Sequence, residues 1–399
     1  MTRSSSSRHS VRKLANPRHG TVVVLTALLL VFILGLAALA VDVGYLHMGR
    51  TQLQTAADSG ALAGASSLID GTVFDGTPSA PNSNFGSSAA RSSAVSYAQS
   101  NRVCDAFPAV SPNNTNDPNG DVVLGYLSDP SNRSQKLDTS NPALFNACQV
   151  TVQRTASENG LVKTFFGRVL GYNGVPELAR ATAVVSSSVS GFQATAESGN
   201  PMVLPFAMEQ TKWEIFMAND GRCGCTDGLK FQQSNHGIYS GTDGLREMRL
   251  YPLSNGASGN FGTVDIGGAN NSTADLERQI LHGISAADMQ ALGKPLKLGL
   301  DGTMTLNGDT GISAAVKDEL LAIRGQPRAI PLYSKVTGNG NNATYTIVGF
   351  VGVRVMDVNL TGTPKYVKVQ PAGVMDRTAI ISTVPNQSQF IFSDPRLVR

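Results

Sequence analysis

Charged and aromatic residues are both scarce in this sequence. Of its 399 residues, 15% are charged and 6% are aromatic, with a single Trp, whereas Gly occurs 41 times. With 41% hydrophobic residues the chain is neither fibrous nor generally disordered, and it has room for about two or three domains. The composition suits a loop-rich, largely β protein better than a cytosolic helical enzyme.

Motifs of the common catalytic classes are also missing. The sequence has no G-x-x-x-x-G-K-[ST] phosphate loop, no H-E-x-x-H pair and no G-x-S-x-G elbow. The histidines that follow the N-terminal tail, His47, His236 and His282, are scattered. A Ser/His/Asp triad assembled in space keeps an anchored hydrolase open as an alternative. We nevertheless expect no catalysis and no cofactor.

A run without any charged residue extends from Gly20 to Val41, directly before Asp42. About 20 apolar residues cross the roughly 30 Å hydrocarbon core of a bilayer as a helix. Five cations and no acidic residue precede the run: Arg3, Arg8, Arg12, Lys13 and Arg18. By the positive-inside rule we expect a single-pass membrane protein with a cytoplasmic N-terminus and an extracytoplasmic bulk. Asp42 then lies at the membrane interface.

Apart from the five N-terminal cations, the chain contains 27 basic and 29 acidic residues, so the remaining charges are nearly balanced. We therefore expect no nucleic-acid partner.

The helical pattern continues beyond the apolar run. Leu46, Leu53 and Ala57 continue one helix face, which predicts a single helix to about Leu68. On this extension the small residues Ala57, Gly60, Ala61 and Gly64 allow another helix to approach closely. The sequence leaves open whether that helix belongs to this chain or to a partner. Ala38-Leu39-Ala40 also fits a signal-peptidase site, although the apolar run is longer than the usual signal core.

Several short motifs follow one another here: RHG at 18–20, VDVG at 41–44, RTQLQTAAD at 50–58 and ALAGA at 61–65. In this order they resemble the N-terminal region of the TadE/TadG-like Flp pilus-assembly proteins, closely over about 50 residues and more loosely to about Ser190. The resemblance implies an envelope protein of the tight-adherence (Tad) pilus or secretion apparatus, with a pilin-like first helix. The Asp-x-Ser-x-Ser metal motif of the adhesion domains found in some TadG-like proteins is absent.

The sequence departs from the pilin pattern at one position. Type IV prepilins are cut after a Gly and usually carry Glu five residues into the mature helix. A cut between Gly20 and Thr21 fits this pattern, but the fifth residue after it is Leu25. We therefore expect an assembly protein or a minor component rather than a shaft subunit, and an intact anchor rather than a processed one.

All four cysteines, Cys104, Cys148, Cys223 and Cys225, follow the apolar run. An oxidising compartment makes disulfides plausible, and three pairings are open. Because Cys104 and Cys148 fall in the same candidate domain, we expect them to pair; a bridge within Cys223-Gly224-Cys225 would close a short, strained ring. Asp227 and His236 lie near this pair without zinc-site spacing, so we expect no metal.

The domain expectations follow from turn-rich stretches at 70–86 and 185–200. The expected segments are a basic tail 1–19, a transmembrane helix 20–41, a helix extension 42–68, an α+β domain 70–190 and a β-rich domain 201–399.

The first domain should contain a helix at 89–100, alternating strands near 122–126, 148–152 and 181–185, and a helix at 161–171 ending at Gly171. The second should contain a helix that begins at Ser272 or Thr273 and ends at Gly283, a helix from Ser313 to Gly325, and alternating strands at 345–355 and 367–369. Its single Trp, Trp213, is expected in the core. The predicted fold class is α+β.

These expectations predict a membrane-anchored, non-enzymatic Flp/Tad-type pilus-assembly or minor pilin-like protein. Its partners would be the membrane and, through the N-terminal helix, the pilus machinery or pilin subunits. An anchored extracytoplasmic binding or surface protein unrelated to pili is the other alternative beside a hydrolase.

Overall fold

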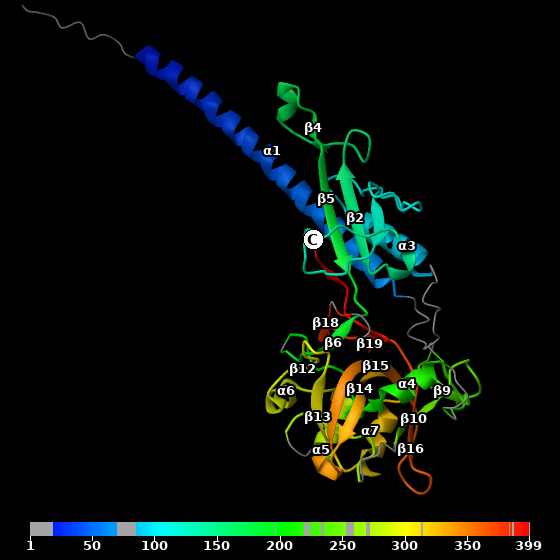
Figure 1. The fold of residues 1–399 in the computed structure, drawn as a ribbon. Helices are drawn as coiled ribbons and strands as arrows, with labels where there is room; N and C mark the ends of the chain where they lie inside the picture. Colours follow the sequence, from blue (N-terminus) through cyan, green and yellow to red (C-terminus); the bar gives the residue numbers. More distant parts are fainter. Residues whose placement is uncertain are drawn as a thin grey trace, which may run out of the picture.

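The computed structural model describes residues 19–69, 85–195, 197–218, 223, 225–232, 235–252, 259–268, 272–312, 314–382, 384 and 387–398. The expected basic tail before His19 and most of the loop expected at 70–86 lie outside these residues. A long helix projects from two bodies stacked end to end (Figure 1). We call residues 42–69, 85–185 and 394–398 the proximal part and residues 189–392 the distal part.

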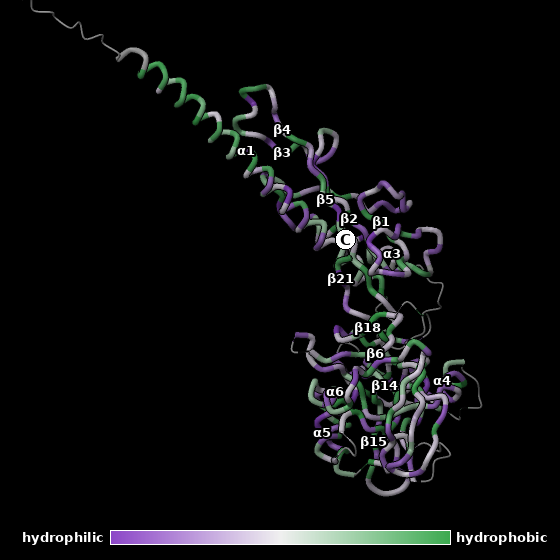
Figure 2. The backbone as a smooth tube through the Cα atoms, turned by 60° about the vertical axis from the view of Figure 1, so that its left-hand side comes forward, coloured by the Kyte–Doolittle hydropathy of each residue, from purple (hydrophilic) through white to green (hydrophobic). Residues whose placement is uncertain are grey.

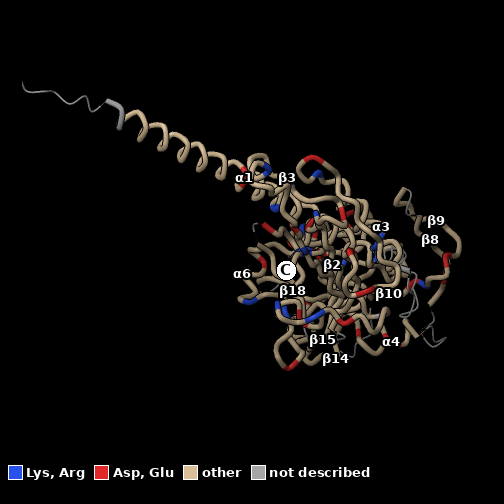
Figure 3. The backbone as a smooth tube through the Cα atoms, turned by 90° about the horizontal axis from the view of Figure 1, so that it is seen from above, with Lys and Arg blue, Asp and Glu red and all other residues tan. Residues whose placement is uncertain are grey.

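Helix α1 runs without interruption from His19 to Ser66. The side chains of residues 22–41 are exposed, with Ala38 half-buried, whereas a stripe from Asp42 to Ala65 is buried. Among the described residues this one helix is long and apolar enough to cross a membrane. Its projecting half is hydrophobic and carries no Lys, Arg, Asp or Glu between residues 22 and 41 (Figures 2 and 3). The prediction of one helix from the apolar run to about Leu68 is confirmed.

The proximal part is an antiparallel sheet covered by helices. Its strand order is β1 (Val122–Gly125), β2 (Ala147–Arg154), β5 (Glu177–Val184) and β21 (Arg396–Leu397). The second half of α1 packs on β2, β5 and α3 (Phe85–Gln99). The strands predicted near 122–126, 148–152 and 181–185 are confirmed, and Leu124, Cys148 and Ala183 are fully buried in one core. The prediction of a helix at 89–100 is confirmed by α3.

A hairpin replaces the helix expected at 161–171. Strands β3 (Val162–Lys163) and β4 (Gly174–Val175) pair antiparallel, and between them lies only the 3-10 turn η2 (Gly167–Leu170). The expected helix is therefore wrong, because pairing with β4 fixes Val162 and Lys163 as extended backbone. Gly171 does cap the turn, with φ 87° in the left-handed region.

The distal part is organised around β15 (Thr344–Asn359). This strand pairs with β13 (Met304–Gly308), β14 (Pro327–Thr337), β16 (Tyr366–Pro371) and β19 (Ser388–Gln389), and β7 (Met208–Glu209), β10 (Met248–Tyr251) and β11 (Val264–Asp265) extend the sheet. The register shifts where Val348 has no partner on β14. Such an extra residue turns the following side chains to the other face, so Ile347 and Val351 lie in different cores. The strands predicted at 345–355 and 367–369 are confirmed.

Smaller elements surround this sheet. The helices are α4 (Gln210–Met217), α5 (Thr273–His282), α6 (Ala286–Leu292) and α7 (Lys317–Ala322). The short strand pairs are β8 (Leu229–Gln232) with β9 (Gly237–Ser240), and β17 (Val374–Met375) with β20 (Ile391–Phe392). A three-stranded sheet has the order β12 (Leu296–Lys297), β6 (Val189–Phe192) and β18 (Ala379–Ile381).

The two helices expected in the distal part are found. Helix α5 begins at a capping box in which the Ser272 hydroxyl accepts from the Asp275 N–H, and it ends at Gly283 as expected. Helix α7 follows the short turn η4 (Ala314–Val316) and buries Leu320. Its expected cap, Ser313, lies outside the described residues. The expected burial of Trp213 is confirmed, because its side chain is fully buried.

The chain crosses between the two parts twice. The first crossing leads from β5 to β6 and the second from β20 to β21, which returns to the proximal sheet (Figure 1). At this neck the Ser186 N–H donates to the Ser393 hydroxyl at 3.0 Å, and the Ser393 N–H donates to the Ser186 carbonyl at 2.8 Å. The interpretation of residues 185–200 as a linker is therefore wrong, since β6 lies within them. The β-rich segment expected at 201–399 likewise differs from the observed pairing, because β21 belongs to the proximal sheet.

Candidate functional site

The point where α1 enters the proximal part is organised by one buried carboxylate. Asp42 follows the apolar run directly, and only 7% of its surface is exposed. Its side chain accepts hydrogen bonds from the backbone N–H groups of Phe165 at 2.7 Å, Phe166 at 3.1 Å and Gly167 at 2.7 Å. We call Asp42 together with the loop 165–172 the helix-exit site.

The physical reason for this contact lies at the start of η2. The first N–H groups of a helical turn have no partner within the turn, and a carboxylate satisfies several of them and favours their partial positive charge. Burial alone would raise the pKa of Asp42, but the bonds from Phe165, Gly167 and Phe166 outweigh it and hold the pKa below its usual value. Asp42 is therefore a fixed anion that attaches the hairpin to α1.

An aromatic contact strengthens the same attachment. The rings of Tyr45 and Phe165 meet edge to face with centroids 4.9 Å apart. The Thr164 hydroxyl donates to the Tyr172 carbonyl and closes the loop. The loop 165–172 is thus held against α1 at its start and closed on the hairpin at its end.

The base of the hairpin is held by charges. Asp105 pairs with Lys163 at 2.8 Å and with Arg154 at 3.1 Å. The hydrogen bond from Lys163, followed by the one from Arg154, lowers the pKa of Asp105 to about 2. The Arg154 guanidinium, which is almost fully buried, also donates to the carbonyls of Val103 and Gly160.

Apolar side chains cover the outer surface of this loop. Phe165, Phe166, Val169, Leu170 and Tyr172 are exposed by 57%, 48%, 86%, 78% and 69%. The interpretation of the sequence missed this surface, because it placed Phe165 and Val169 at helical spacing in a helix at 161–171. The available signal was the run FFGRVLGY, in which two glycines, Gly167 and Gly171, interrupt the apolar residues and disfavour a continuous helix.

The small-residue face of α1 is occupied by the chain itself. Ala57 and Ala61 are fully buried, and a Cβ added to Gly60 would lie 2.9 Å from the Ala94 carbonyl oxygen. A Cβ added to Gly64 would overlap the Cys148 sulfur. Of the two alternatives left open by the sequence, packing on the chain's own body is the one observed. This face of α1 is therefore covered within the chain.

The expected bridge between Cys104 and Cys148 is not formed, and both thiols are free. Cys104 lies beside Gly49 and Cys148 beside Gly64, and fifteen residues of helix separate these glycines by about 22 Å. Burial raises the pKa of the Cys148 thiol to about 12. The bridge that is formed joins Cys223 to Cys225.

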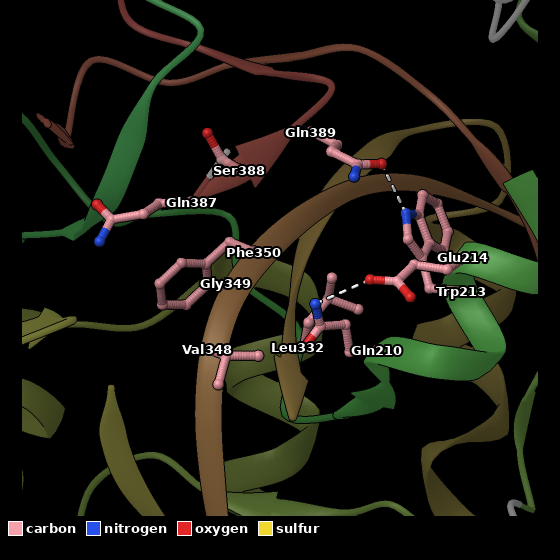
Figure 4. Close-up of a pocket in the computed structure, with 10 residues that line it drawn as sticks. All are labelled: Gln210, Trp213, Glu214, Leu332, Val348, Gly349, Phe350, Gln387, Ser388 and Gln389. Carbon is pink, nitrogen blue, oxygen red and sulfur yellow. Dashed lines mark hydrogen bonds between the residues drawn. The ribbon is translucent and has the colours of Figure 1, made fainter. Parts of the chain in front are cut away.

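A small hollow lies in the distal part between α4, β14, β15 and β19 (Figure 4). The Trp213 indole N–H donates to the Gln389 side-chain oxygen at 2.9 Å, and Gln210 donates to Glu214 at 2.8 Å. The cavity measures about 40 Å³, which holds water molecules rather than an organic ligand. Nowhere among the described residues do three His, Cys, Asp or Glu side chains group together to hold a metal ion.

The fold and the helix-exit site define a class of protein: an α+β body carried on an N-terminal helix that is long and apolar enough to cross a membrane. Two models of known families match part of this chain. Residues 20–67 match a family described as Flp pilus-assembly TadE/G-like, and residues 50–183 match one described as Tad-like Flp pilus-assembly. Over residues 20–183 the chain is therefore similar to Flp pilus-assembly proteins, with the TadE/G-like match over residues 20–67, which confirms the predicted resemblance. No curated protein and no solved structure matches the chain.

Proposed function

We propose that this chain is a non-catalytic component of a Tad/Flp-type pilus, anchored in the membrane by α1 and acting in assembly or as a minor pilin-like subunit. The observation that carries the proposal is the division of α1. Its first half is an exposed apolar rod, and its second half is built into a body related to pilus-assembly proteins. Pilus-related function rests on both family matches.

The anchored topology is supported by charge. The five cations before Gly20 favour a cytoplasmic N-terminus, which leaves both bodies outside. The exposed apolar half of α1 is the surface offered to lipid and to helices of other subunits, because the small-residue face is occupied internally.

The role in assembly, as opposed to the shaft, rests on Leu25 in place of the acid that shaft pilins carry. Both residues of the candidate cut, Gly20 and Thr21, lie in α1. N-terminal sequencing of the mature protein separates the cases: Met1 or Thr2 indicates an intact anchor, Thr21 indicates prepilin-type processing, and Val41 indicates secretion. Sequencing that finds Val41 would remove the anchor from the proposal.

The pilus role is tested by deleting the gene in its own strain and complementing with the full chain. We expect few or no pili after deletion and normal numbers after complementation. As a matched control, the deletion is complemented with Tyr239→Phe, which alters one partly exposed distal residue and leaves α1 intact. Normal pili in the deletion strain, together with no co-purifying pilus subunit, would favour an anchored surface protein unrelated to pili.

A further inference from the structure

The loop 165–172 presents a concentrated apolar surface that the described residues leave largely uncovered. Five of its eight residues are Phe, Val, Leu or Tyr, and each of these is at least 48% exposed. Water-soluble proteins rarely leave such clusters uncovered, and they usually mark a site of contact with a partner or a membrane.

The position of the loop is fixed by contacts already described. Asp42 binds three N–H groups at the start of the loop, and Asp42 is the residue where the apolar run ends. Ala38, one helical turn nearer the N-terminus, is half-buried, whereas Ala37 and Leu39 are exposed. The hairpin β3–β4 points along the projecting half of α1 and away from the distal part (Figure 1). The loop therefore lies at the level where α1 leaves the hydrocarbon core.

The chemistry of the loop fits the interfacial layer of a bilayer. Tyr172 is amphipathic and suits the headgroup level, and Phe165, Val169 and Leu170 are apolar enough to enter the acyl boundary. The loop carries Arg168 and the hairpin from 162 to 175 contains no acidic residue, which favours anionic headgroups, whereas Lys163 is already paired with Asp105. If α1 spans a bilayer, lipid surrounds α1 at the level of Asp42, where the loop lies. The apolar surface of the loop is then continuous with the lipid-facing surface of α1.

We propose that the loop 165–172 is a second membrane contact, inserted into the interfacial layer of the bilayer that α1 crosses. The protein is then held at two points, and Asp42 rigidly connects them. A single membrane contact would allow the body to rotate about the axis of α1, whereas two contacts fix which side of the proximal sheet faces the membrane. This inference rests on the anchoring in the proposed function, but it concerns residues outside the helix.

The test uses the full chain reconstituted in vesicles of phosphatidylcholine and phosphatidylglycerol, with bromine-labelled acyl chains as a quencher of Trp fluorescence. Three variants each add one reporter: Val169→Trp in the loop, Leu30→Trp in the span and Tyr97→Trp on α3. Tyr97 is a matched control because it is 59% exposed and its carbonyl accepts a hydrogen bond from Ser59, about 25 Å along α1 from Asp42. The buried Trp213 gives the same background in all three.

We expect Val169→Trp and Leu30→Trp to be quenched severalfold by brominated lipid, with blue-shifted emission, and Tyr97→Trp to remain unquenched. Quenching of Leu30→Trp without quenching of Val169→Trp overturns this inference and leaves the anchoring intact. Absence of quenching at both positions contradicts the anchoring itself. If Val169→Trp shifts only when pilus subunits are added to the vesicles, the loop binds protein and the inference is wrong.

Discussion

The two halves of α1 form one continuous helix but lie in different surroundings. Between residues 22 and 41 the sequence is apolar all round and the side chains are exposed, whereas between 42 and 66 the buried residues form a stripe. A helix in lipid needs no polar face, because its surroundings are apolar on every side. A helix lying on a sheet buries only one side, so apolar and small residues recur along that side. The end of the uniform apolar pattern, at Asp42, therefore marks the point where α1 passes from its exposed half to its packed half.

Among the predicted effects, a charged residue introduced into the first half of α1 should have the largest, on membrane insertion. Leu30→Arg is expected to weaken membrane insertion, because an Arg at the centre of a span costs about 2.5–3.5 kcal/mol on insertion scales. The measurement is the fraction of protein that resists alkaline extraction from membranes. Met48→Arg, at a position 42% exposed in the second half, is the control and should extract like the parent protein. Equal extraction of both variants would contradict the division of α1.

A bulky residue on the packed half should have the next largest effect. Gly60→Leu is expected to lower the free energy of unfolding by about 1–3 kcal/mol, because α3 leaves no room for the side chain. Thermal or denaturant unfolding in detergent micelles measures the change. Gly44→Leu is the matched control, since an added Cβ there has nothing within 4 Å. If both substitutions destabilise equally, crowding by α3 is not the cause.

Removal of the Asp42 carboxylate, at the boundary between the two halves of α1, should locally detach the β3–β4 hairpin from the helix. Asp42→Ala leaves the N–H groups of Phe165, Phe166 and Gly167 without their acceptor. We expect severalfold faster amide hydrogen exchange in peptides covering 163–175, with little change in peptides from the distal part. Asp42→Asn, which keeps one side-chain acceptor oxygen, should give an intermediate rate. Unchanged exchange in Asp42→Ala would show that the Tyr45–Phe165 contact holds the loop without the carboxylate.

The ion pairs at the hairpin base predict a smaller effect that depends on pH. Asp105 has a lowered pKa, so its stabilising contribution is complete above its unfolded-state value of about 4. The contribution is lost as pH falls toward the folded-state pKa of about 2. The stability difference between the parent and Asp105→Asn should therefore shrink between these two values. A difference that stays constant from neutral to acid pH would contradict the assignment.

The smallest effect is expected at Cys104. Because Cys104 and Cys148 are free, Cys104→Ser should change the free energy of unfolding by no more than about 0.5 kcal/mol. Removal of a native disulfide would cost about 2–5 kcal/mol. Unfolding of the oxidised parent and of Cys104→Ser, measured side by side, distinguishes the two cases.

Much of the fold followed from local patterns. The course of α1, the alternating strands and the capped helix α5 were predictable, because each depends on the spacing of side chains within one segment. The helix expected at 161–171 was wrong because the spacing of Leu161, Phe165 and Val169 does not distinguish a buried face from an exposed loop. The bond between Asp42 and Gly167 joins residues 125 positions apart, and no local pattern reports such a contact.

The same limit explains the errors at longer range. The pairing expected for Cys104 with Cys148 assumed proximity within a domain, whereas the two sulfurs lie beside α1 at points far apart along its length. The pairing of β21 with β5 depends on the chain returning after about two hundred residues, a distance that periodicity does not reveal. The small residues of α1 were predictable as a packing face, but their partner was not.

The double crossing at the neck has a mechanical consequence. A pull on the distal part reaches the proximal sheet through two chain segments, which enter it as the neighbouring strands β5 and β21. The force then acts along β5 and β21 in the same direction, so the hydrogen bonds between β5 and its other antiparallel neighbour, β2, resist it together in shear instead of opening one after another. Tension applied to the distal part is in this way transferred to the sheet that packs directly on α1.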